Sequence, residues 1–82
     1  MALTAQQVAS RCTEIMWPND HAAQGLGIVI RETTPGGAVA EMTVRQDMVN
    51  GHGIAHGGFI FALADTNFAY ACNSFNHYTV AA

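Results

Sequence analysis

Apolar residues recur at helical spacing in the first part of the chain. Within residues 5–16 the positions Val8, Cys12 and Ile15 fall on one face of a helix. Thr4 stands immediately before this segment, and threonine caps helix N-termini through its side-chain oxygen. The pattern therefore predicts an amphipathic helix over residues 5–16 that begins after a threonine cap.

The spacing then changes from helical to that of short strands. A Trp-Pro-Asn-Asp run at 17–20 should end the first helix, because the residue before a proline disfavours the α conformation. Residues 25–32 and 38–45 contain β-branched residues with partial alternation, and the Thr-Pro-Gly-Gly cluster at 34–37 between them has the composition of a tight turn. Together they predict a β-hairpin.

A third segment, residues 58–74, is apolar around nearly the whole circumference of a helix. Between residues 59 and 72 only Asp65, Thr66 and Asn67 are polar. A helix of this kind belongs in a core or an interface rather than on a surface. A carboxylate is costly to bury unless it is paired, hydrogen-bonded or chemically active. Asp65 is therefore either a functional group or a paired structural acid.

The final residues, 78–82, have the composition of a strand that is just beginning. One hairpin and this stub offer too little sheet to cover a helix that is apolar on all sides. We therefore expect the 82 residues to form the N-terminal portion of a single domain whose later strands are absent.

Composition limits the partners and the compartment. A chain of 82 residues, half of them apolar, makes at most one domain. The net charge is −3 and the only cations besides histidine are three arginines, which argues against nucleic acid as a partner. The sequence lacks a basic and apolar N-terminal signal and any uninterrupted apolar run of ~18 residues, so we expect a cytoplasmic protein with no membrane contact. Its two cysteines lie sixty residues apart and are expected to be reduced thiols.

A glycine-rich stretch, NGHGIAHGG at residues 50–58, leads directly into the apolar helix. Gly57 and Gly58 leave the helix N-terminus unobstructed, so backbone N–H groups and the positive end of the helix dipole can approach a ligand oxygen closely. This arrangement predicts an oxyanion hole. Asp65 would then either take a proton from an attacking water or attack a carbonyl carbon itself.

Each polar residue of this loop has a functional and a structural interpretation. Asn50 could position the water or the acyl group, or it could stabilise the turn beside Gly51. His56 could hydrogen-bond a substrate carbonyl or cap the helix, and His52 is a further substrate-binding candidate. On a helix His52 and His56 would face one metal ion, but the surrounding glycines argue against a helix there. We therefore expect neither a metal nor a cofactor.

The spacing of the two main candidates carries a prediction about assembly. Gly57 and Asp65 are eight residues apart, which separates them by about 12 Å along one helix. A carbonyl group held at its oxygen by one residue and approached at its carbon by the other requires them within ~7 Å. Two antiparallel helices across a two-fold axis would satisfy this requirement, so we expect composite sites in a dimer.

These motifs together resemble the hotdog-fold acyl-CoA thioesterases, most closely the phenylacetyl-CoA-pathway group of phenylacetic acid degradation. The resemblance rests on NGH at 50–52, HGG at 56–58 and an aspartate after six further residues. It implies an α+β fold in which a curved antiparallel sheet wraps a long central helix, and homodimers or homotetramers of such subunits. It also implies hydrolysis of an aromatic acyl-CoA, carrying a phenylacetyl, hydroxylated phenylacetyl or benzoyl group, to the free acid and coenzyme A.

The resemblance assigns roles to individual residues. It implies catalytic roles for Asp65, Gly57 and Asn50, and substrate-binding roles for His56, Gly58 and His52. The alternative is a non-catalytic acyl-CoA-binding or regulatory hotdog module that uses the helix N-terminus only to hold a ligand. Asp65 discriminates between the two, because a binding module has no need of a carboxylate beside a thioester.

Overall fold

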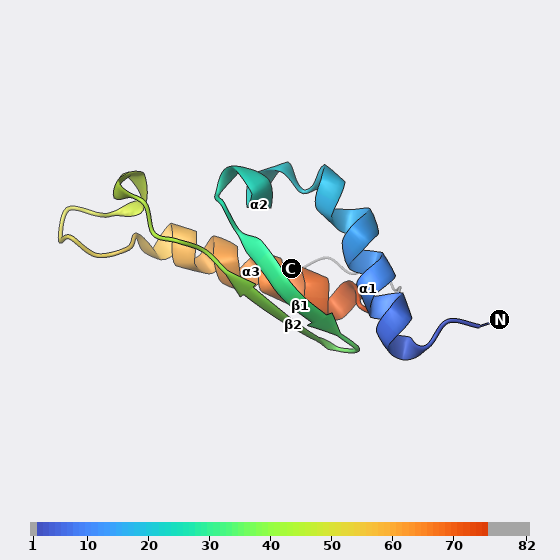
Figure 1. The fold of residues 1–82 in the computed structure, drawn as a ribbon. Helices are drawn as coiled ribbons and strands as arrows, with labels where there is room; N and C mark the ends of the chain where they lie inside the picture. The colour runs from blue at the N-terminus through green and yellow to red at the C-terminus, as the bar shows by residue number, and fades with distance from the viewer. Residues whose placement is uncertain (1, 76–82) are drawn as a thin grey trace.

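The structure, a computed structural model, describes residues 2–75 and shows two helices that pack on a β-hairpin (Figure 1). The elements are α1 (Ala5–Met16), η1 (Trp17–Asn19), α2 (His21–Gly25), β1 (Val29–Thr34), β2 (Gly37–Glu41), η2 (Gln46–Met48) and α3 (Gly57–Asn73), where η marks a short 3-10 helix. The strand expected at residues 78–82 lies outside the described residues.

The first helix, α1, has the bounds that its sequence predicts. Thr4 Oγ1 accepts a hydrogen bond from the Gln7 N–H at 3.1 Å, and Gln7 Oε1 accepts one from the Thr4 N–H at 2.8 Å. This reciprocal pair is a capping box, which satisfies two N–H groups at the start of the helix. The threonine cap is therefore confirmed, and Gln7 completes it.

The face that α1 turns toward β1 differs in part from the predicted one. Ala9 is buried, and the Thr13 hydroxyl lies 2.6 Å from the Thr33 hydroxyl of β1. Ile15, expected on the apolar face, is 64% exposed. The contact face is thus rotated toward small and hydroxyl-bearing residues, because these allow the helix to approach the strand closely.

A short helix that the sequence analysis did not predict separates α1 from the hairpin. Asp20 Oδ1 accepts a hydrogen bond from the Ala23 N–H at 3.2 Å and so caps α2. Gly27 then adopts a left-handed conformation, with φ of 71°, and turns the chain into β1. For this reason β1 begins at Val29 and not at residue 25.

The predicted hairpin is confirmed, with shorter strands than expected. β1 and β2 pair antiparallel, with an irregularity between Ile30 and Glu32 and with Val29 opposite Glu41. Residues 42–45 have no strand opposite them in the described part of the chain, because residues 25–28 belong to α2 and its turn. β2 therefore ends at Glu41.

The long apolar helix is confirmed as α3, which packs along β2. Its C-terminal end is tied to the other elements by two buried side chains. The Tyr70 hydroxyl donates to Asp20 Oδ2 at 3.0 Å, and Ser74 Oγ accepts from the Gly36 N–H at 2.7 Å in the hairpin turn. Burial, together with the Asp20 carboxylate, raises the pKa of the Tyr70 hydroxyl well above its usual range.

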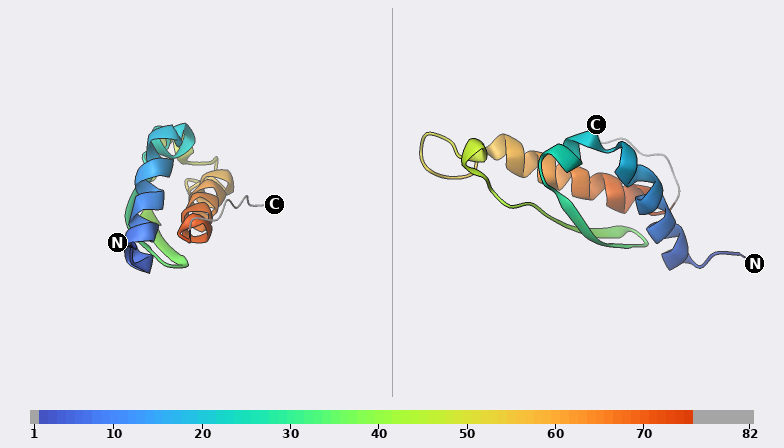
Figure 2. Two further views of the ribbon diagram at one scale, coloured as in Figure 1. Left: turned by 90° about the vertical axis from the view of Figure 1, so that its right-hand side faces the viewer. Right: turned by 45° about the horizontal axis from the view of Figure 1, so that its top comes forward.

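The N-terminal end of α3 extends beyond the hairpin, and the glycine-rich loop projects at this end (Figures 1 and 2). The other end of the helix lies near α1 and the tip of the hairpin (Figure 1). The candidate residues of the loop and of the α3 N-terminus therefore lie at the projecting end, whereas Asp65 lies further along the helix. Across residues 2–75, none of the helices has the length and apolar character needed to span a bilayer.

Candidate active site

The N-terminus of α3 is capped by the histidine that precedes it. His56 has an extended backbone, with φ of −64° and ψ of 133°, and its Nδ1 accepts a hydrogen bond from the Gly58 N–H at 2.9 Å. Because Nδ1 accepts, it carries no proton, and the neutral imidazole holds its proton on Nε2. His56 therefore caps the helix and also has a free ring donor, on a side chain that is exposed.

This cap leaves a single backbone donor open. The Phe59 and Ile60 N–H groups donate to the His56 carbonyl at 3.0 and 3.4 Å, while Gly58 donates to the His56 ring. Of the four N–H groups that begin α3, only that of Gly57 has no acceptor among residues 2–75. A Cβ at residue 57 would meet no heavy atom within 4 Å. Gly57 thus presents an accessible N–H at the positive end of the helix dipole.

Gly58 differs from Gly57 both in the hydrogen bond of its N–H and in the space available for a Cβ. Its N–H is occupied by His56, and a Cβ at this position would lie 3.1 Å from His56 Nδ1. Such a contact is tight enough to displace the imidazole ring. The structure therefore connects Gly58 to the His56 cap, whereas Gly57 has no such contact.

The glycine-rich loop is closed by Asn50. Its Oδ1 accepts hydrogen bonds from the His52 N–H at 2.8 Å and the Ile54 N–H at 3.4 Å, and its own N–H donates to the Ile54 carbonyl at 2.8 Å. Gly53 makes the turn possible with φ of 79°. The side-chain oxygen of Asn50 thus stabilises the turn, while its amide nitrogen has no acceptor in the described part of the chain.

His52 lies exposed in this loop. Because η2 ends at Met48 and α3 begins at Gly57, His52 and His56 share a loop and not a helix. Among residues 2–75, no group of three or more histidine, cysteine, aspartate or glutamate side chains is placed to hold a metal ion.

Asp65 lies in the middle of α3 on an exposed apolar face. Helical spacing places Phe61, Asp65 and Phe68 on the same side of the helix as Gly57, and the two phenylalanines are 71% and 50% exposed. Asp65 itself is exposed, and its carboxylate has no hydrogen bond or ion pair among residues 2–75. We expected this helix to lie in a core or an interface, and within one chain the hairpin covers only one side of it.

One residue that supports the site was not identified from the sequence. Met48 is fully buried, and its carbonyl accepts a hydrogen bond from the His56 N–H at 2.7 Å. This bond, together with a bridge between Val49 and Ala55, closes the base of the loop. The available signal was the apolar pair Met48-Val49 between the polar residues Gln46, Asp47 and Asn50, which indicates an anchor for a loop.

Comparison with known proteins identifies the relatives of this chain. No family model matches it. It is 56% identical over 59 residues to the acyl-coenzyme A thioesterase PaaI of Escherichia coli (strain K12), covering 72% of this chain and 42% of that protein. Its fold matches the structure of the E. coli PaaI protein from the phenylacetic acid degradation operon with a TM-score of 0.93 at 46% identity, over 96% of this chain and 57% of the other. The chain is homologous to PaaI.

The homology with PaaI confirms the predicted hotdog fold, of the α+β class, with α3 as its long helix. A putative esterase of Archaeoglobus fulgidus is also similar, with 40% identity over 68 residues, 83% of this chain and 44% of that protein. The chain spans less than half the length of these two curated relatives.

Proposed function

We propose that the protein hydrolyses the thioester bond of an acyl-CoA and releases the free acid and coenzyme A. The observation that carries this proposal is the open Gly57 N–H at the start of α3, with an unpaired carboxylate, Asp65, on the same exposed side of the helix. The homology to a protein named acyl-coenzyme A thioesterase supports it. We further propose that the chain supplies the N-terminal portion, residues 1–82, of one hotdog domain, and that it acts in the cytoplasm.

The chemistry follows from where negative charge develops. When water adds to the thioester carbonyl, the carbonyl oxygen becomes an oxyanion, and each preorganised donor aimed at it contributes about 3–4 kcal/mol to catalysis. Gly57 N–H is the first such donor and His56 Nε2–H is the second. The intermediate then collapses, the C–S bond breaks and the coenzyme A thiolate leaves.

Asp65 supplies the group that the attacking nucleophile requires. Either its carboxylate takes the proton of the water as the new C–O bond forms, or it attacks the carbonyl carbon itself and the resulting anhydride is hydrolysed. The free amide nitrogen of Asn50 would position the water or the acyl group. Gly58 and His52 take supporting roles in substrate binding, Gly58 through the His56 cap and His52 from the exposed loop.

The site is composed from two subunits. Gly57 and Asp65 belong to one straight helical segment and are about 12 Å apart, too far to act on one carbonyl. Two copies that place their exposed α3 faces together in antiparallel orientation would cover Phe61 and Phe68. They would also bring Gly57 of each chain to Asp65 of the partner subunit. We therefore propose a homodimer, or a homotetramer built from two such dimers, with composite sites.

The acyl group we propose is aromatic: phenylacetyl, hydroxylated phenylacetyl or benzoyl. The phenylacetic acid degradation operon of the E. coli relative supports this class.

The test is Asp65→Asn in the full-length protein, which removes proton acceptance and nucleophilic attack while keeping the side-chain shape. We expect kcat on phenylacetyl-CoA to fall by ~10²–10⁴, while the free energy of unfolding stays unchanged. Glu14→Gln, on the exposed surface of α1, is the matched control for loss of one carboxylate. Normal turnover by the folded Asp65→Asn protein would refute the enzymatic proposal. A wild-type protein that binds acyl-CoA without cleaving it would favour the non-catalytic module.

A further inference from the structure

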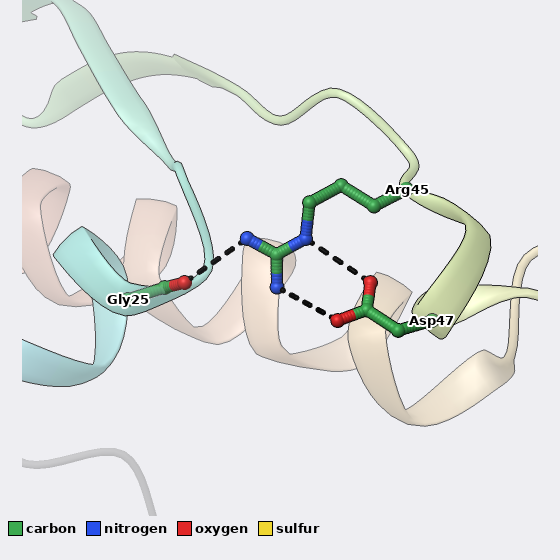
Figure 3. A network of polar contacts seen from close by, with 3 residues as sticks. All are labelled: Gly25, Arg45 and Asp47. Atoms are coloured by element: carbon green, nitrogen blue, oxygen red, sulfur yellow. Dashed lines mark hydrogen bonds and ion pairs between the residues drawn. The ribbon is translucent and has the colours of Figure 1, made fainter.

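Arg45 joins two segments that have no role in the chemistry described above. Its Nη1 donates to the carbonyl of Gly25, the last residue of α2, at 3.1 Å, and its Nε and Nη2 donate to Asp47 Oδ1 and Oδ2 at 3.1 and 3.5 Å (Figure 3). Carbonyl groups at a helix C-terminus lack partners within the helix, so Arg45 caps α2. Because Asp47 belongs to η2, the same guanidinium fixes η2 to the end of α2.

Two backbone hydrogen bonds connect the main chain of Arg45 to the proposed oxyanion site. The Met48 N–H donates to the Arg45 carbonyl at 2.9 Å, and the Met48 carbonyl accepts from the His56 N–H at 2.7 Å. His56 in turn caps α3 through Gly58, which leaves Gly57 as the open donor. The path from α2 to the donor therefore runs through Arg45, η2 and His56.

We propose that Arg45 is a positioning residue for the oxyanion donors. By holding η2 against the end of α2, it fixes the Met48 carbonyl, and the Met48 carbonyl fixes the backbone of His56 and hence the directions of His56 Nε2–H and Gly57 N–H. Its catalytic consequence rests on the proposed thioesterase function. The Arg45 and Asp47 side chains are 45% and 70% exposed, so the ion pair itself adds little to global stability. The expected effect is local, because a misplacement of about 1 Å at a catalytic group can cost far more rate than stability.

The experiment compares Arg45→Met with Arg11→Met. Both changes replace an exposed arginine that faces a nearby acid with an unbranched apolar side chain, but Arg11 lies on α1 and contacts Glu14 at 3.9 Å. Amide hydrogen exchange is followed by NMR at the His56 and Gly58 amides, which need no substrate, and kcat and KM are measured on phenylacetyl-CoA. Arg45→Lys is included because lysine keeps the charge and can still reach one acceptor.

In Arg45→Met we expect amide exchange at His56 and Gly58 to accelerate about three- to tenfold. This is the size expected for the loss of one charge-assisted hydrogen bond at a partly exposed position. We expect kcat to fall about tenfold with KM nearly unchanged, because misplaced donors weaken stabilisation of the transition state more than binding of the substrate. Arg45→Lys should show smaller changes in both exchange and kcat than Arg45→Met, and Arg11→Met should show neither change.

Two results would overturn the positioning role. One is unchanged exchange at His56 and Gly58 in Arg45→Met. The other is an acceleration that is equally large at Tyr70 in the core, which would mean that Arg45 serves global stability. A wild-type protein without thioesterase activity would instead refute the proposed function, and the exchange measurements would still decide whether Arg45 positions the donors.

Discussion

Subunit complementation tests the composite site most directly, and the structure provides two clean variants for it. Gly57 occupies the first position of α3, where proline is well tolerated, and His56 already has the extended backbone that a residue before proline prefers. A Cβ at residue 57 meets no heavy atom within 4 Å. Gly57→Pro should therefore fold normally and remove only the open N–H. Asp65→Asn removes the carboxylate about 12 Å away along the same helix.

Each variant should be nearly inactive alone, and a mixture of the two should regain activity. In a mixed dimer one site receives both damaged groups, and the other receives the intact Gly57 of one chain and the intact Asp65 of the other. If equal amounts exchange at random, half of the dimers are mixed and each has one intact site, so activity should approach about a quarter of the wild-type value.

The assay is thioester hydrolysis, followed by release of the free thiol, before and after exchange. Native mass spectrometry of chains with different tags measures the fraction of mixed dimers independently. If mixed dimers form and activity stays at the level of the single variants, both groups act within one chain. The antiparallel pairing of α3, which rests on the separation of about 12 Å, would then be wrong.

Two further predictions concern single residues. Gly57→Pro should lower kcat by ~10²–10³, as expected for one lost oxyanion donor, and Gly57→Ala should lower it less because alanine keeps the N–H; equal and mild losses would mean that Gly57 serves only the turn. Tyr70→Phe should lower the free energy of unfolding in urea by about 1–2 kcal/mol at neutral pH, because Asp20 Oδ2 loses its donor. Because the pKa of Tyr70 is raised in the folded protein, its neutral hydroxyl stabilises the fold below the ordinary tyrosine pKa of about 10. This stabilisation is lost as the pH rises from about 10 toward the raised pKa, so the alkaline loss of stability should be weaker in Tyr70→Phe. Identical alkaline curves for the two proteins would contradict this.

Local signals in the sequence were sufficient for the main elements. The Thr4 cap, the turn at 34–37 and the apolar segment after Gly57 each predicted a structure that depends on neighbouring residues, and all three are present. The loop before α3 was also predicted, with helix capping by His56 and turn stabilisation by Asn50 as open alternatives, but the detailed set of hydrogen bonds was not. They depend on which ring nitrogen of His56 accepts and on which N–H groups this leaves open.

Contacts between distant residues account for most of what could not be predicted. α2 exists partly because Asp20 caps it while accepting a hydrogen bond from Tyr70, fifty residues later. Ser74 stabilises the hairpin turn at Gly36 across a separation of 38 residues. Neither partner is visible from local spacing. The exposure of Asp65 was missed for a related reason, since all-round apolarity does not say which surfaces come from the same chain.

The hydrogen bonds of Tyr70 and Ser74 hold α3 at its C-terminal end, so the direction of the helix axis determines where Gly57 lies. From Tyr70 to Gly57 the helix forms an arm of about 20 Å. A tilt of about 5° about the C-terminal end would move Gly57 by nearly 2 Å. A displacement of only about 1 Å at a catalytic group can already lower the rate strongly. A helix fastened only at its C-terminal end could therefore be well folded and still be a poor catalyst. Fixing its orientation requires a second point of attachment near Gly57, and thermal stability alone would not reveal whether that attachment is intact.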